Sequence, residues 1–284
     1  MREVKLRSPL QFMLVGIVLL YAGGLIIAPI AAIVQGAFGK GLDGLFAALT
    51  EPDVIHAFQV TLFLSIIAAL VNLVAGVVLA WVLVRHQFPG KRLLSALVDA
   101  PFIISPVIIG YVLIVLFGRQ GWINIPGIQI AFALPGMLIA TIIVSMPFVT
   151  REVMPVLANL GPEQEEGAYT LGANRWLTFW RIVLPEIRWS LLYGLALTFA
   201  RALGEFGAVV VVGGAIQGYS ESATVYVFRA LNDRNKIGAY GVSIVLALLS
   251  VVLLMGMEQF KRRPKTLDVI QEEVQDVDFI GTSN

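Results

Sequence analysis

The chain has 284 residues, of which 58% are hydrophobic and 14% charged, and its mean hydropathy is +0.84. This composition excludes an ordinary water-soluble globular domain and is typical of a membrane protein. The net charge of +1 gives no overall attraction to nucleic acid, and the absence of cysteine excludes disulfides, cysteine metal sites and a thiol nucleophile.

Six long apolar runs predict an all-α, polytopic membrane protein with six transmembrane helices. The predicted spans cover residues 11–37, 56–84, 93–117, 128–149, 189–212 and 237–260. The first run follows a short basic segment but is too long for a cleaved signal peptide, so we interpret it as a retained span. Residues 1–10 and 261–284 are predicted to flank the 11–260 transmembrane domain, and the acidic tail is expected to be mobile.

The distribution of basic residues between the loops predicts the orientation of the spans. Fourteen of the 20 Lys and Arg residues fall in the N-terminal segment, the loops after the second and fourth spans, and the tail, whereas five fall in the other loops. Cytoplasmic segments carry the excess of positive charge, so both termini are predicted to be cytoplasmic. The same rule places the polar loop at residues 159–188 in the cytoplasm.

The 159–188 loop is predicted to form two short helices joined by a glycine. Pro162 and the glutamates that follow it suit the positive start of a helix. Gly172 supplies the left-handed residue that ends the first helix, and Asn174 can cap a second helix that is expected to stop at Pro185. Large aromatic residues in the second helix are typical of an element in the membrane interface that offers its other side to a partner: Trp176, Phe179 and Trp180.

One face of the fifth predicted span is polar, since five residues recur at steps of three and four: Ser190, Gly194, Thr198, Arg201 and Glu205. A charge at mid-membrane costs about 2.5 to 3.5 kcal/mol on insertion scales, so this stripe should face protein or water. Two interpretations stay open. Arg201 and Glu205 either neutralise each other and lock helices together, or line a translocation path in which Arg201 helps an anion through. Asp99 in the third span either belongs to the same path or pairs with Arg201.

The order of residues in the 159–188 loop resembles the EAA signature of the permease subunits of type I ABC importers: Glu166-Gly167-Ala168, then Gly172, then Ile182-Val183-Leu184-Pro185. In that family the loop docks into a groove of a cytoplasmic ATP-hydrolysing subunit, and the resemblance implies the same coupling role here. Gly167 stands where the family usually has alanine, which loosens the helix by roughly 1 kcal/mol without removing a contact group. The residues implied in coupling are Glu165, Glu166, Ala168, Gly172, Ala173, Ile182, Leu184 and Pro185.

A second resemblance concerns the spans. The runs FARALGEFGA at 199–208, DAPF at 99–102 and SPV at 105–107 look like the sulfate/thiosulfate and molybdate branch of these permeases. The run VVVVGG at 209–214 and the basic-ended C-terminus look more like the second membrane subunit of the sulfate importers. The resemblance gives weight to a translocation path or gate formed by Asp99, Ser105, Pro106, Thr198, Arg201 and Glu205.

The resemblance therefore implies a permease subunit of a bacterial inner membrane that takes up sulfate or thiosulfate. Its implied partners are a cytoplasmic ABC ATPase dimer that binds ATP and magnesium, a sister permease in a heterodimer, an extracytoplasmic sulfate-binding protein, and membrane lipid. The chain has no nucleotide-binding glycine pattern of its own, so we expect no catalytic residue, metal or cofactor in it, and no nucleic-acid partner.

Three alternatives stay open at this point. The first is a molybdate or tungstate permease of the same branch, which would imply a homodimer. In a different class, it is an ion-coupled secondary transporter that uses Arg201, Glu205 and Asp99, although no inverted repeat is evident. A membrane enzyme with paired carboxylates is the third, but Asp99 and Glu205 lack a nucleophile, histidine or metal cluster nearby in the sequence.

Overall fold

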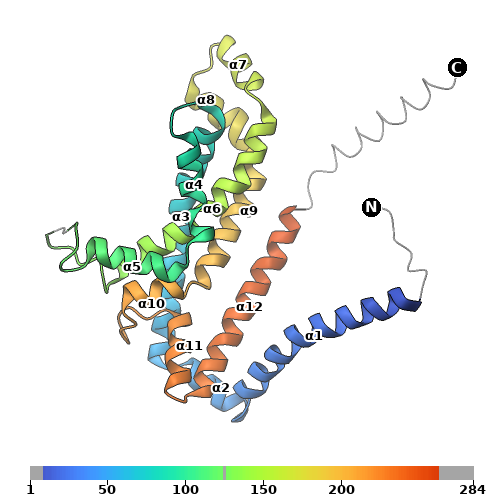
Figure 1. The fold of residues 1–284 in the computed structure, drawn as a ribbon, viewed down its shortest axis with the longest axis vertical. Coiled ribbons are helices and arrows are strands. Elements are labelled where there is room, and N and C mark those ends of the chain that lie inside the picture. Colours follow the sequence, from blue (N-terminus) through green and yellow to red (C-terminus); the bar gives the residue numbers. More distant parts are fainter. Residues whose placement is uncertain (1–8, 124–125, 262–284) are drawn as a thin grey trace.

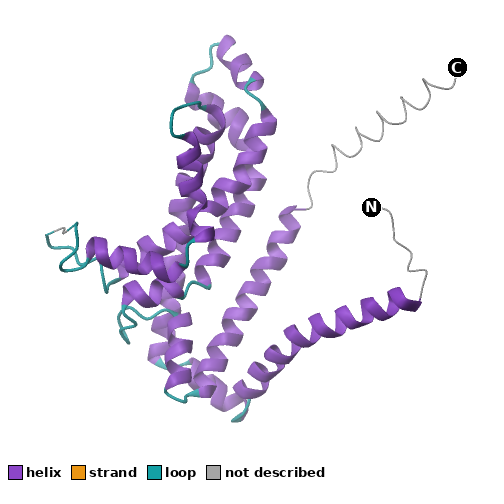
Figure 2. Ribbon diagram, in the orientation of Figure 1, coloured by secondary structure: helices purple, strands orange, loops and turns teal. Residues whose placement is uncertain are grey.

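The computed structural model describes residues 9–123 and 126–261, and every regular element in these ranges is a helix (Figures 1 and 2). The elements are α1 (Pro9–Ala37), α2 (Gly41–Leu49), α3 (Pro52–Arg85), α4 (Lys91–Ile103), α5 (Pro106–Phe117), α6 (Leu134–Leu160), α7 (Glu163–Thr170), α8 (Arg175–Thr178), the π-helical turn η1 (Phe179–Val183), α9 (Leu184–Leu203), α10 (Gly207–Gly213), α11 (Ala223–Asn232) and α12 (Lys236–Lys261). Most of the predicted terminal segments, 1–10 and 261–284, lie outside the described residues.

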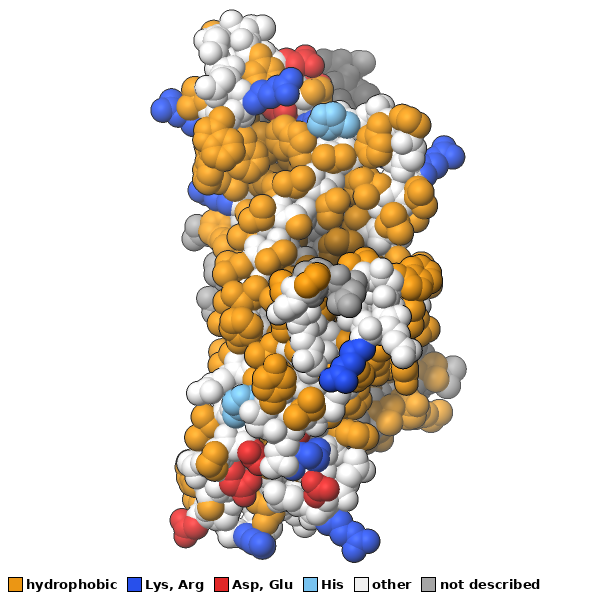
Figure 3. Space-filling view, turned by 90° about the vertical axis from the view of Figure 1, so that its left-hand side faces the viewer, with side chains coloured by type: hydrophobic (Ala, Val, Ile, Leu, Met, Phe, Trp, Pro, Cys, Tyr) orange, Lys and Arg blue, Asp and Glu red, His pale blue; other side chains and the backbone are white. Residues whose placement is uncertain are grey.

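The fold is that of a polytopic membrane protein, as the sequence predicts. Five helices of the described chain are long and apolar enough to cross a membrane, and the bent pair α4 and α5 raises the number to six when it counts as one span. On the face drawn in Figure 3, charged side chains gather toward the two ends of the molecule, and the surface between them is mainly hydrophobic. That arrangement suits a molecule whose middle lies in lipid.

Three long helices, α3, α6 and α9, form the centre of the molecule, and small residues allow their close approach. A Cβ atom added to Gly76 of α3 would lie 2.6 Å from the Val149 side chain of α6, and one added to Gly194 of α9 would lie 2.9 Å from the Cα atom of Val149. Small residues at such crossings let backbones pack without a gap, which is how helices associate in lipid. The three helices are therefore a rigid unit on which the shorter elements lie.

The first helix stands apart from this unit. Helix α1 diverges from the bundle and approaches it only where it meets α12 and α2 (Figure 1). At that end the packing is tight, because a Cβ atom on Gly36 would overlap the ring of Tyr240. The apolar side chains described along the rest of α1 are largely exposed, so within this chain they have no protein cover.

The prediction that the third span is one continuous helix is wrong. Helices α4 and α5 meet at a bend of 114°. Pro106 begins α5 and disfavours a helical conformation in the residue before it, and both Ile104 and Ser105 are extended, with ψ of 131° and 134°. We call α4, residues 104–105 and α5 the broken span.

Two more spans differ from their predicted bounds. The fourth begins at Leu134 and not at Ile128, because Pro135 starts α6 and the preceding residues are irregular, with the Phe132 N–H donating to the Val212 carbonyl at 2.7 Å. The fifth, predicted to run to residue 212, breaks after Leu203, and α10 follows as a separate short helix. The predicted outer loops also contain two short helices, α2 and α11, that long-window hydropathy does not detect.

Candidate functional site: the elbow and the charged residues of the spans

Residues 159–188, which we call the elbow, lie at the end of the molecule drawn uppermost in Figure 1. Helix α7 ends before Gly172, whose φ of +87° is the left-handed conformation that the sequence predicts there. The Asn174 side chain then accepts a hydrogen bond from the Leu177 N–H at 2.8 Å and caps α8. The predicted pair of short helices and both of its capping residues are confirmed.

The predicted stop at Pro185 is wrong, because the chain runs on as helix into α9. Residues 179–183 form a π-helical turn in which the Leu184 N–H donates to the Phe179 carbonyl. The wider turn takes the chain past Pro185, which has no N–H to give and lies in the first turn of α9. As a result, the second arm of the elbow is continuous with a transmembrane helix.

An ion pair fixes the first arm of the elbow to α3. Glu165 is 5% exposed, its Oε1 atom lies 2.6 Å from Arg85 Nη2, and Arg85 Nε donates to the same oxygen at 2.9 Å. Arg85 Nη2 also donates to the Gly161 carbonyl at 2.7 Å. Glu165, predicted as a coupling residue, therefore holds the elbow in place, while the neighbouring Glu166 is exposed.

The outer surface of the elbow carries an exposed apolar patch, made up of Tyr169, Leu171, Trp176, Leu177 and Trp180. Trp176 is 70% exposed and lies edge to face with Trp180 at a ring-centroid distance of 5.7 Å. An adjoining groove of about 440 Å³ lies between the elbow and the end of α3. Exposed apolar residues gathered in this way mark an interaction surface.

The remaining predicted coupling residues differ in burial. Ala168, Ala173, Ile182 and Leu184 are half-buried, and Pro185 is exposed. Val183, between two of them, is fully buried and packs with Val153 and Leu157 of α6 and with Ile187. The elbow thus shares a hydrophobic core with α6 and α9, and a displacement of one must move the others.

Arg201 and Glu205, for which the sequence left two interpretations open, form an ion pair where α9 ends. Arg201 Nη1 lies 2.7 Å from Glu205 Oε2 without hydrogen-bond alignment, and the two side chains are 32% and 2% exposed. Glu205 Oε1 accepts the Ala208 N–H at 2.9 Å, and its carbonyl accepts the Thr224 hydroxyl at 2.7 Å. Glu205 is thus held from several sides at the break between α9 and α10, whereas the Arg201 side chain stays partly open.

Asp99 pairs with Arg151 of α6, so the possibility that it is the partner of Arg201 is wrong. Arg151 Nε donates to Asp99 Oδ1 at 2.6 Å, and Nη2 contacts Oδ2 and donates to the Ser95 hydroxyl at 3.0 Å. Both charged side chains are about one-third exposed. Ser105 and Pro106, the other predicted path residues of this region, lie at the bend of the broken span.

The part of the polar stripe that precedes Arg201 packs inside the chain. Thr198 is buried and its hydroxyl donates to the Gly194 carbonyl at 2.8 Å, while Gly194 faces Val149 of α6. Of the stripe, Arg201 is the residue that presents a charge at the surface of this chain. The stripe therefore combines a helix-packing half with a charged half.

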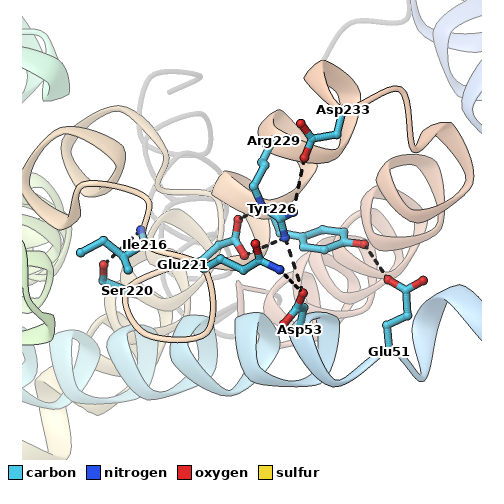
Figure 4. Close-up of polar contacts among 9 residues, drawn as sticks. Glu51, Asp53, Ile216, Ser220, Glu221, Tyr226, Arg229 and Asp233 are labelled. Atoms are coloured by element: carbon cyan, nitrogen blue, oxygen red, sulfur yellow. Dashed lines mark hydrogen bonds and ion pairs between the residues drawn. The ribbon is translucent and has the colours of Figure 1, made fainter.

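A further polar cluster, which the sequence does not predict and which is drawn in Figure 4, lies around α11, at the end opposite the elbow (Figure 1). Arg229 donates to both oxygens of the buried Glu221 at 2.7 and 3.1 Å and lies near Asp233 and Asp53. Hydrogen bonding to Glu221 raises the pKa of Arg229. Burial, followed by the nearby Glu51 charge, raises the pKa of Tyr226 to about 12. The cluster joins residues 51–53 to residues 221–233, two segments distant in sequence, which no local spacing can reveal.

Known proteins similar to this chain agree on one family. The family described as "binding-protein-dependent transport system inner membrane component" matches residues 72–265. A sulfate transport system permease protein CysW from Synechocystis is 45% identical over 257 residues, covering 89% of this chain and 93% of that protein. A permease protein CysT of the sulfate transport system, from the same organism, is 39% identical over 254 residues, covering 87% and 89%. The solved structure of a bacterial ABC transporter for alginate import shows the same fold, with a TM-score of 0.72 at 20% identity over 90% of this chain and 96% of that chain.

Proposed function

The chain belongs to the family of binding-protein-dependent transport system inner membrane components, and we propose that it is a permease subunit of an ABC importer for sulfate or thiosulfate. The observation that carries the proposal is the elbow, a pair of short helices with an exposed apolar patch, which is continuous with α9 and held to α3 by an ion pair. A family member of this kind is a permease in the inner membrane and is not itself an ATPase. It must therefore receive its driving force from another subunit.

The elbow is the surface on which that force is applied. Two cytoplasmic ATPase subunits bind ATP and magnesium, and their closure displaces the groove in which the exposed patch rests. The ion pair between Arg85 and Glu165 and the shared core with α6 and α9 make the elbow stiff enough to pass on the movement. Glu166, Ala168, Gly172 and Ala173 form the side of the elbow turned toward the ATPase, and Ile182, Leu184 and Pro185 connect it to α9.

The transport path runs between this chain and a sister permease. Two partly exposed ion pairs, Asp99–Arg151 and Arg201–Glu205, support this, because charged groups at membrane depth need protein or water beside them. Arg201 offers a positive charge to a dianion, while Ser105, Pro106 and Thr198 shape the surrounding helices. A CysW-type and a CysT-type relative in one organism support a heterodimer, and the alginate transporter solved with its periplasmic protein supports an extracytoplasmic binding protein as the donor of substrate.

Reconstitution tests the proposal. This chain, a CysT-type sister, the ATPase and the sulfate-binding protein are purified together and placed in liposomes, and the uptake of radioactive sulfate, thiosulfate and molybdate is measured with ATP on the ATPase side. We expect ATP-dependent sulfate or thiosulfate uptake that needs the binding protein. Uptake of molybdate in preference to sulfate would identify the chain as a molybdate permease instead. Sulfate movement by this chain alone along an ion gradient would make it a secondary transporter.

A further inference from the structure

Side-chain contacts attach the α4 part of the broken span to α6, and the proposed function does not explain them. Two contacts from α4 reach the same helix within one turn. Asp99 is held by Arg151, and the Phe102 ring lies edge to face with Phe148 at a centroid distance of 5.4 Å. Both contacts lie just before the bend at residues 104–105. The broken span is thus tied to α6 immediately ahead of its one non-helical joint.

The Asp99–Arg151 contact has the geometry of a mechanical link. The guanidinium group engages both carboxylate oxygens and the Ser95 hydroxyl, and a bidentate pair of this kind fixes orientation as well as distance. Arg151 also contacts the Met154 sulfur on its own helix at 3.6 Å. Asp99 and Ser95 already engage Nε and Nη2 of Arg151, so an anion would have to compete with Asp99 for the bidentate position, and the pair is poorly suited to be a substrate site. It is well suited to make α4 follow α6.

Helix α6 leads directly from this pair to the elbow. Arg151 lies nine residues before Leu160, which is about 14 Å along an α-helix. Between them, the buried Val153 and Leu157 pack against Val183 and Ile187, which belong to the arm of the elbow that continues into α9. A push on the elbow therefore reaches Arg151 through a packed segment without an intervening loop.

We propose that Arg151 and Asp99 are positioning residues that transmit displacement of the elbow to the broken span, so that α5 turns about residues 104–105 and changes access to the path. This inference rests on the proposed function, because it needs an ATPase that moves the elbow. It assigns the movable wall of the path to α5, which packs mainly on α10 and less extensively on α6, and which lies across the bundle in Figure 1. Arg201, in the last turn of α9, and Glu205, at the break that follows, come directly before α10 in the chain.

The experiment measures substrate molecules taken up per ATP hydrolysed by the complete transporter with its binding protein. Asp99→Asn removes one charge of the link, and Arg151→Lys keeps the charge but loses the bidentate contact. Each should lower the uptake-to-ATP ratio at least tenfold while the ATPase rate stays within twofold of the unsubstituted transporter. The exchange Asp99→Arg with Arg151→Asp should restore at least part of the ratio. Arg92→Gln, an exposed arginine on the same helix α4, serves as the control and should leave the ratio unchanged.

An unchanged ratio in Arg151→Lys and Asp99→Asn would overturn the link. Failure of both variants to assemble would also overturn it, because the pair would then be a structural lock; if only Asp99→Asn fails to assemble, Arg151→Lys decides. Failure of the proposed function is distinguishable, since the unsubstituted transporter would then show no ATP-dependent sulfate or thiosulfate uptake.

Discussion

Arg85 at the end of α3 and Glu165 in α7 are joined by an ion pair with a contact of 2.6 Å, and both side chains are largely buried. The same guanidinium group holds the Gly161 carbonyl at the start of the elbow. Through this one arginine, the loop between α6 and α9 is fixed to the end of a third span, α3. An importer driven from outside needs such stiffness, because a loose loop would absorb the displacement that it receives.

Glu165→Ala tests this attachment. Removing one partner leaves the Arg85 charge largely buried without its carboxylate, a change that typically costs about 3 to 5 kcal/mol. We expect a lower melting temperature of the purified transporter and faster proteolysis within residues 159–188. The exposed neighbour provides the control, since Glu166→Ala should leave the melting temperature nearly unchanged. Equal melting temperatures for the two variants would show that the pair does not stiffen the elbow.

Gly172→Val tests the joint between the two arms of the elbow. A Cβ atom at this position would meet no other atom within 4 Å, so the cost lies in the backbone, where φ is +87°. A left-handed conformation costs an ordinary residue about 1 to 2 kcal/mol, and asparagine less. We expect Gly172→Val to abolish co-purification with the ATPase or to uncouple ATP hydrolysis from uptake, and Gly172→Asn to retain both. Normal coupled uptake by the valine variant would contradict the role given to the joint.

Arg201→Ala tests the path. The substitution removes the exposed cation of the stripe but also leaves Glu205 without its ion-pair partner, so it is paired with the double substitution Arg201→Ala/Glu205→Gln. We expect both variants to assemble to a similar extent, the double variant being the more stable, and both to lose at least tenfold in sulfate uptake. If the double variant restores uptake along with assembly, the pair is a helix lock and not part of the path.

The polar cluster around Arg229 and Tyr226 gives a prediction of pH dependence. The pKa of Tyr226 is about 12 in the folded chain and about 10 in an unfolded one, so its contribution to folding stability is complete below pH 10. Between pH 10 and 12 the unfolded chain loses the proton first, and the folded state loses stability. We expect the melting temperature of Tyr226→Phe to fall less over this range than that of the unsubstituted protein, with Tyr219→Phe as an exposed tyrosine control. Parallel curves would show that Tyr226 does not retain its proton in this way.

Much of the architecture follows from the sequence because it depends on local properties. Hydropathy over long windows finds the helices now seen as α1, α3 and α12, and the charges and caps of residues 162–174 are enough to predict the joint of the elbow. The resemblance of residues 166–185 to a known signature adds the coupling role.

The features that the sequence does not predict depend on tertiary context. Proline is tolerated in many spans, so Pro106 alone does not reveal that the third span bends by 114° while Pro147 and Pro155 remain inside one helix. Pro185 is passed without a stop because a π-helical turn precedes it. Arg151, 52 residues from Asp99, falls outside the predicted span at 128–149, and only the packing of α4 on α6 brings the two together.

The central claim is that the elbow faces the cytoplasm and receives the ATPase, and single-cysteine labelling tests it most directly. The chain has no cysteine, and Leu171 at the tip of the elbow is 90% exposed, so Leu171→Cys gives one accessible thiol. A membrane-impermeant maleimide should label this thiol in inside-out vesicles but not in right-side-out ones, and bound ATPase should protect it. Labelling from the outer side of sealed vesicles would contradict the account.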